Sequence, residues 1–155
     1  MSASSLLINT TFTLVLATSN MLTSSNADDN AYLGFFAGAY RSCSELYPPE
    51  QVSASRDIAA ERRNCYLNQV VAALSQLPPD SPVRLQMALQ VAPEYADGTF
   101  VSALQAGFDP YYAVTAATRA LPEQDLIFAN LAIARGADPS QVTQATAAGL
   151  RRHLY

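Results

Sequence analysis

Two cysteines and one histidine are the side chains of this sequence best suited to covalent or metal chemistry. Cys43 and Cys65 lie 22 residues apart, which excludes the CxxC spacing of redox-active pairs. A zinc site needs about four ligands, and His153, near the end of the chain, is the only histidine. We therefore predict no metal site, and we predict a disulfide between Cys43 and Cys65. The alternative is two reduced, buried cysteines that act as small apolar side chains.

Carboxylates are the next candidates for chemistry, and we interpret them as structural. Asp57 and Glu61 lie one helical turn apart, which predicts a salt-bridged surface because arginines surround them, namely Arg56, Arg62 and Arg63. Glu94 and Asp97 are expected in a first helical turn, where acids face the positive end of the helix. The sequence contains no G-x-S-x-G, H-E-x-x-H, P-loop or G-x-G-x-x-G motif. We thus predict no catalytic residue and no cofactor.

Aromatic residues supply a candidate surface for binding another protein. Phe108, Tyr111 and Tyr112 lie within five residues, and tyrosine is enriched where proteins bind one another. Adjacent residues on a helix point about 100° apart, so one of the two tyrosines is expected at the surface or at an edge. The alternative is that these rings pack in the core and the tyrosine hydroxyls reach water.

A 29-residue repeat organises the elements that hold these side chains. Its clearest unit is Gly-x-Asp-Pro, with Gly107, Asp109 and Pro110 repeated as Gly136, Asp138 and Pro139; Asp80, Pro93 and Pro122 keep the same spacing. Glycine suits the left-handed conformation that ends a helix. Aspartate suits the N-cap of the next helix, and proline suits its first turn. We interpret the motif as a signal that ends one helix and begins another, rather than as a metal or phosphate loop.

The sequence predicts an all-α fold of about seven short helices. Apolar residues recur with a period near 3.6, and paired prolines at 48–49 and 78–79 interrupt them. We expect a disulfide-capped hairpin over residues 28–76 and stacked helix pairs over residues 80–155, in either a solenoid-like stack or a compact bundle. The expected helices are 30–47, 54–76, 82–91, 94–106, 110–120, 123–135 and 139–152.

One short segment resembles a known repeat. Arg135-Gly-Ala-Asp-Pro139 resembles the tip of an ankyrin hairpin. The resemblance covers five residues, after which Ser140-Gln-Val-Thr143 replaces the Thr-Pro-Leu-His pattern of that family. The period of 29 also differs from the ankyrin period of 33. We therefore assign the chain to no family.

The first 27 residues carry no charged side chain, and we interpret them as a signal peptide. A short apolar centre is followed by Ser25-Asn26-Ala27, which fits the small-x-small pattern of signal peptidase sites. The single domain would then be residues 28–155. The apolar run is too short for a stable membrane anchor. The alternative is a cytoplasmic protein with a disordered N-terminal tail.

The charge composition of the chain argues against one class of function, nucleic-acid binding. The 155 residues carry a net charge of −4, and all nine basic residues are arginine. This balance argues against nucleic-acid binding, which relies on clustered basic side chains. We expect a periplasmic or secreted protein that binds a protein partner, as an inhibitor, an immunity protein or an envelope assembly factor does. The alternatives are a carrier of a small apolar ligand or lipid between helices and an enzyme of unrecognised type.

Overall fold

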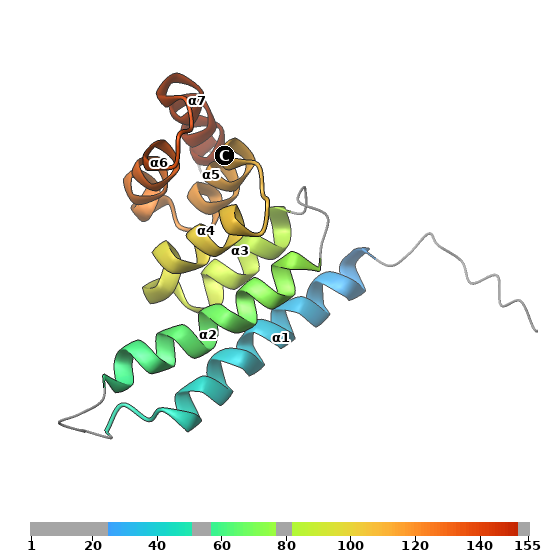
Figure 1. Cartoon of the computed structure of the whole chain (residues 1–155). Helices are drawn as coiled ribbons and strands as arrows, with labels where there is room; N and C mark the ends of the chain where they lie inside the picture. The colour runs from blue at the N-terminus through green and yellow to red at the C-terminus, as the bar shows by residue number, and fades with distance from the viewer. Residues whose placement is uncertain (1–24, 51–56, 77–81, 152–155) are drawn as a thin grey trace, which may run out of the picture.

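The computed structural model describes residues 25–50, 57–76 and 82–151. Seven α-helices and two short 3₁₀ turns form the described part of the chain, which contains no strand (Figure 1). The all-α prediction is therefore confirmed. In chain order the elements are α1 (Ser25–Leu46), α2 (Ile58–Ser75), α3 (Pro82–Val91), η1 (Pro93–Tyr95), α4 (Ala96–Gln105), α5 (Pro110–Ala120), η2 (Pro122–Gln124), α6 (Asp125–Ala134) and α7 (Pro139–Leu150).

The repeated Gly-x-Asp-Pro motif ends one helix and begins the next. Gly107 and Gly136 have φ angles of 95° and 93°, a conformation that costs glycine little because it has no Cβ. Asp109 caps α5 by accepting from the backbone N–H groups of Tyr111 and Tyr112, and Asp138 caps α7 in the same way. This is the capping geometry that the sequence predicts. The third member of the series, Asp80, lies outside the described residues.

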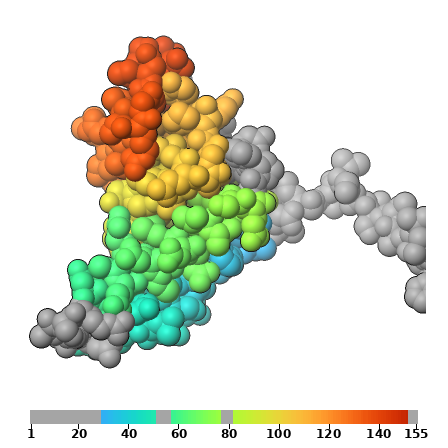
Figure 2. Space-filling model, in the orientation of Figure 1, coloured from blue at the N-terminus to red at the C-terminus, as the bar shows by residue number. Residues whose placement is uncertain are grey.

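The helices stack as pairs in two layers. Helices α1, α3, α5 and α7 contact one another in succession and form one layer, while α2, α4 and α6 form the other. Within each pair the two layers meet, since α1 packs on α2, α3 on α4 and α5 on α6. Coloured by residue number, the space-filling surface shows successive bands along this stack (Figure 2). Of the two shapes that the sequence allows, the contacts correspond to stacked helix pairs.

A single apolar core runs between the layers. Its largest buried side chains include Phe36, Tyr66, Phe100 and Phe128, and the rings of Phe100 and Phe128 lie 5.3 Å apart. Many other core positions are alanine, which lets helices approach closely because its side chain is one methyl group. The short helices depend on this shared core, since an isolated helix of about ten residues is unstable in water.

Several predicted helix boundaries were wrong, for local reasons. Helix α1 begins at Ser25 rather than residue 30, so cleavage after Ala27 would remove its first residues. Helix α2 begins at Ile58 rather than residue 54, because Asp57 caps it by accepting from the N–H of Ala60. The predicted helices 94–106 and 123–135 each divide into a 3₁₀ turn and an α-helix. In both turns the first residue is a proline, Pro93 or Pro122, and i→i+3 hydrogen bonds tighten the chain.

Candidate functional site

The predicted disulfide is confirmed. It joins Cys43 of α1 to Cys65 of α2, with the Cα atoms 5.8 Å apart. Arg62 adds a second link between the same segments, because its Nε donates a 2.8 Å hydrogen bond to the carbonyl of Tyr47. The α1–α2 hairpin therefore presents α2 in a fixed position to the rest of the stack.

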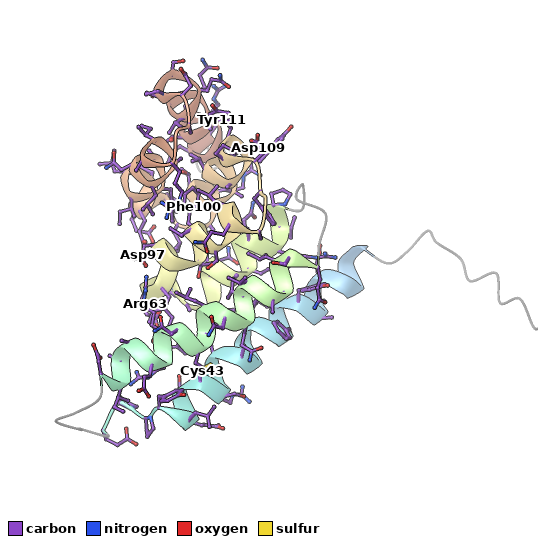
Figure 3. The ribbon with its side chains drawn as sticks, viewed as in Figure 1. Cys43, Arg63, Asp97, Phe100, Asp109 and Tyr111 are labelled. Carbon is purple, nitrogen blue, oxygen red and sulfur yellow. A yellow bond between two sulfur atoms is a disulfide. The ribbon has the colours of Figure 1, made fainter. Side chains whose placement is uncertain are left out.

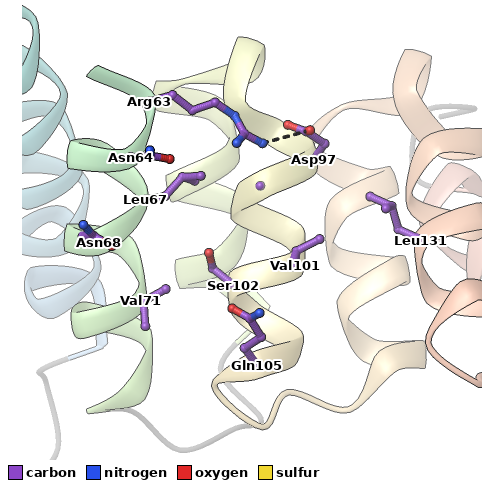
Figure 4. A pocket seen from close by; sticks show the side chains of 11 residues that line it. Arg63, Asn64, Leu67, Asn68, Val71, Asp97, Val101, Ser102, Gln105 and Leu131 are labelled. Carbon is purple, nitrogen blue, oxygen red and sulfur yellow. Dashed lines mark hydrogen bonds and ion pairs between the residues drawn. The ribbon is translucent and has the colours of Figure 1, made fainter. Parts of the chain in front are cut away.

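A groove crosses the layer formed by α2, α4 and α6 (Figure 4). It has a volume of about 480 Å³. Arg63 of α2 and Asp97 of α4 form an ion pair across it at 3.0 Å, although 34 residues separate them in the sequence. Figure 3 shows the two side chains approaching each other from facing helices. The arginine side chain is 38% exposed and the aspartate 54% exposed, so both remain accessible to a partner.

Gly98 allows α2 and α4 to approach at this point. A Cβ atom placed on Gly98 would lie 2.5 Å from Leu67 Cδ1 and 2.8 Å from a guanidinium nitrogen of Arg63. Any larger residue would displace the end of the leucine or arginine side chain, because both distances are shorter than ordinary van der Waals contact. Glycine at this position therefore shapes the end of the groove that carries the ion pair.

Carboxamide side chains line the middle of the groove. Asn64 and Asn68 lie one turn apart on α2, Gln105 extends from α4, and all three are exposed. Within the described part of the chain, none of these three carboxamides forms a hydrogen bond. Apolar side chains lie beside them, including Val71, Val101 and Leu131. The groove thus combines hydrogen-bonding groups with apolar contact area.

The carboxylates have partners that sequence reasoning did not foresee. Asp57, expected in a salt-bridged surface with Glu61, is the N-cap of α2, and Arg63, expected in the same surface, forms an ion pair with the distant Asp97. Arg56 lies outside the described residues. Asp97 does lie in a first helical turn, but no signal in the sequence indicates its pairing with α2.

Glu94 links η1 to α1. The hydroxyl of Tyr40 donates a 2.6 Å hydrogen bond to its Oε1. This bond favours the neutral phenol and, with burial, raises the pKa of Tyr40 to about 12. Tyr66, whose ring lies 5.8 Å from that of Tyr40, donates to the carbonyl of Ala88, and burial raises its pKa above the ordinary value. These contacts fix the hairpin to α3 and η1, so we assign them a structural role.

The structure separates the three residues of the predicted aromatic surface. Phe108 is 4% exposed and belongs to the core, so it forms no part of a surface. Tyr111 packs against the core, and its hydroxyl accepts from the N–H of Asp138 at 3.1 Å. Tyr112 is 64% exposed. With residues of α7 that include Gln141 and Gln144, the two tyrosines line a second hollow of about 560 Å³, which we call the tyrosine hollow.

Metal-ligating clusters and membrane-spanning helices were sought among the described residues. Within them, no three acidic, cysteine or histidine side chains come together as a metal would require. None of their helices has the length and hydropathy needed to cross a membrane. His153 lies outside the described part of the chain.

The fold and the groove define a small disulfide-linked stack of helix pairs with an open, mixed polar and apolar surface. Comparisons with family models, curated proteins and solved structures give no match for this chain. A functional conclusion must therefore come from the groove itself.

Proposed function

We propose that this protein binds a segment of a partner protein in the groove across α2, α4 and α6. The observation that carries the proposal is the row of unused carboxamides, Asn64, Asn68 and Gln105, on exposed turns of stacked helices. A carboxamide both donates and accepts hydrogen bonds, as the peptide backbone does. An extended polypeptide can therefore satisfy these groups without a matching set of charged side chains.

The rest of the groove matches the same kind of ligand. Leu67, Val71 and Val101 offer apolar contact to alternate side chains of an extended segment, which point to opposite sides of its backbone. The exposed Arg63–Asp97 pair lies at one end and can form additional hydrogen bonds with a polar group of the partner. Stacked helix pairs commonly bind partners along such extended surfaces.

Export belongs to the same proposal. A structural disulfide such as Cys43–Cys65 forms and persists in oxidising compartments, and residues 1–27 have the composition of a signal peptide. We expect the mature protein in the periplasm or outside the cell, with Asp28 as its first residue. An intact mass measured on protein from its native host tests this step, and a mass that includes residues 1–27 would contradict it.

The binding proposal is tested by crosslinking from two different surfaces. A photoreactive amino acid replaces Asn68 in the groove or, as the matched control, Gln144 in the tyrosine hollow. Both positions are exposed and helical, so the two variants should fold equally well. We expect one discrete protein adduct from position 68 and none from position 144.

Affinity measurements with the purified adduct partner then locate the contact. Replacing both Asn64 and Asn68 with alanine removes two hydrogen-bonding groups, and we expect affinity to fall by about tenfold or more. Tyr112→Ser, in the tyrosine hollow, should leave it unchanged. If Tyr112→Ser lowers the affinity and the double alanine variant does not, the partner binds at the tyrosine hollow and the proposal for the groove is wrong. A small apolar molecule retained in native mass spectrometry would favour the carrier alternative instead.

A further inference from the structure

The exposed side of α6 is largely apolar, and it lies in the same layer as the groove. Leu126, Ile127 and Ile133 are 72%, 45% and 38% exposed, and we call the surface that they form the α6 face. Leu131, on the side of α6 toward α4, already lines the groove. Large apolar side chains on one exposed face commonly mark a site that another molecule covers.

The 29-residue repeat shows that the α6 face continues the groove. Residues of α4 that line the groove have equivalents 29 positions later on α6: Asp97 corresponds to Leu126, Gly98 to Ile127 and Ser102 to Leu131. Both helices belong to one layer of stacked pairs, so equivalent residues face the same side of the stack. Leu131 agrees with this relation, because it lines the groove as Ser102 does.

The same position of the repeat is charged on α4 and apolar on α6. On α4, Asp97 forms its 3.0 Å ion pair with Arg63 of α2. On α6, the equivalent residue is Leu126, which is 72% exposed. Arg63, Asp97 and Leu126 therefore form one row across the three helices of the layer. This row is ionic at α2 and α4 and apolar at α6.

The charged side chains of α6 and its two ends leave the α6 face apolar. Asp125 begins the helix, and its Oδ1 accepts from the backbone N–H of Leu126. Glu123 precedes the helix in η2, and Arg135 follows it as the C-cap. Between these ends, the exposed residues of α6 are apolar except Asn130. A large apolar side chain therefore gains contact area on this face, whereas a charged one gains no ion pair there.

We propose that the partner segment in the groove runs along this row from α2 to α6 and places a large apolar side chain on Leu126 and Ile127. The inference rests on the proposed function, because one segment occupies both the groove and the α6 face. Neighbouring helices lie about 9 Å apart and an extended chain advances about 3.3 Å per residue. The apolar residue is therefore about two to four positions along the segment from the residue that contacts Asp97.

Leu126→Asp changes the chemistry of this row while the helix keeps its start. The equivalent position of α4 already carries an aspartate, Asp97, and an acidic side chain is favourable in the first turn of a helix. Leu126 is largely exposed, so no neighbour has to repack. Leu46→Asp, at a 67% exposed position of α1 outside the groove, adds the same charge and is the matched control. Circular dichroism checks that both variants keep the helicity of the parent.

Peptide selection provides a defined probe for the row. A phage-displayed library of random linear peptides is selected on the oxidised full chain, and we expect the enriched peptides to share a large apolar residue. Selection on Leu126→Asp should replace that residue with lysine or arginine, because the new carboxylate binds a cation. Selection on Leu46→Asp should give the same peptides as the parent. If Leu126→Asp also selects the same peptides as the parent, the inference is wrong.

The affinity of one parent-selected peptide separates this inference from the proposed function. Leu126→Asp should weaken binding by about tenfold or more, because the apolar contact is lost, and Leu46→Asp should leave it unchanged. If the double alanine variant of Asn64 and Asn68 weakens binding and Leu126→Asp does not, the groove stands and the inference is wrong. If Leu126→Asp alone weakens binding, the peptide lies outside the groove, which contradicts both. Failure to enrich any peptide also contradicts both.

A second copy of the chain is the competing occupant of the α6 face. Sedimentation equilibrium of the parent and of Leu126→Asp distinguishes it from the peptide segment. We expect the two proteins to have the same molecular mass. A parent dimer that dissociates in Leu126→Asp would assign the α6 face to a second copy and overturn the inference.

Discussion

The two halves of this stack are held together by different means. Helices α1 and α2 are 22 and 18 residues long and are joined by a disulfide, whereas α3 to α7 have 10 to 12 residues each. In the second half a capping aspartate and a left-handed glycine recur at each Gly-x-Asp-Pro turn. The long hairpin is therefore fixed by one covalent link, and the short helices by many local contacts and the shared core. A single change should affect the two halves to different degrees.

Removing a core ring of the short-helix half should have the largest effect. Phe100 is fully buried and packs against Phe128, so Phe100→Ala leaves a cavity and should cost about 3–5 kcal/mol of unfolding free energy. Urea denaturation measures this loss. Phe35→Ala, at a 43% exposed position of the hairpin, should cost clearly less. Equal losses would show that burial of the ring does not determine how much each phenylalanine stabilises the fold.

Removing the disulfide should have the next largest effect. The bond between Cys43 and Cys65 closes a loop of 22 residues in sequence separation, and its loss should cost about 3 kcal/mol because the unfolded chain gains freedom. The Cys43→Ser/Cys65→Ser variant, compared with the parent by urea denaturation, gives this value. Added reductant should destabilise the parent and leave the double variant unchanged. If reductant does not change the unfolding free energy of the parent, packing alone accounts for the stability of the hairpin.

Loss of one cap should have a smaller, local effect. Asp109→Ala removes the acceptor for two backbone N–H groups at the start of α5, and we expect a loss of about 1 kcal/mol. Asp109→Asn keeps an acceptor oxygen at the same place and should retain most of the stability. If the alanine and asparagine variants behave alike, the aspartate acts by its charge rather than by capping.

The hairpin should respond to alkaline pH through Tyr40. Its pKa is raised to about 12 by the hydrogen bond to Glu94 and by burial, compared with about 10 in an unfolded chain. The neutral phenol therefore stabilises the fold below pH 10, and this contribution is lost as the pH rises from about 10 to 12. Unfolding free energies measured across this range should fall less steeply for Tyr40→Phe. Tyr112→Phe, at an exposed position of the second half, should keep the parent profile.

The second half should respond to acid through Asp138, with the smallest effect. The hydroxyl of Ser140 and the N–H of Gln141 donate to its carboxylate and lower its pKa. The stabilising contribution is present above the unfolded pKa of aspartate and is lost as the pH falls through the lower, folded value. A carbon-detected NMR titration measures this pKa directly. Ser140→Ala removes the first cause, so the pKa should rise toward the ordinary value, and an unchanged pKa would contradict the assignment.

The turns between short helices were the most predictable part of the molecule. Gly107, Asp109 and Pro110 act on their immediate neighbours, so their types and order are sufficient to end one helix and begin the next. The disulfide was also predictable, because the chain holds two cysteines and the helix break between them allows them to meet. Boundaries set by competing local signals were less predictable. The sequence placed Asp57 in a salt-bridged surface, whereas the structure shows that α2 begins directly after Asp57 and that Asp57 caps it.

The candidate groove could not be predicted. Its ion pair joins Arg63 to Asp97 across two helices, and neither residue stands in a recognisable motif. Its carboxamides belong to residue types that are common on protein surfaces. They line one groove only because α2, α4 and α6 form one layer. The aromatic surface was predicted from three neighbouring residues, and burial of Phe108 removed one of them.

The sequence by itself determined that the chain is helical and where each Gly-x-Asp-Pro turn ends one helix and begins the next, because these properties depend on residues within a turn or two of one another. It also allowed a single disulfide, because the chain holds two cysteines. The tertiary structure decided which helices share a layer and which side chains line the groove. Those outcomes depend on how apolar faces of distant segments pack together. That packing is a property of the whole chain, and the hydrophobic effect that drives it is not directional.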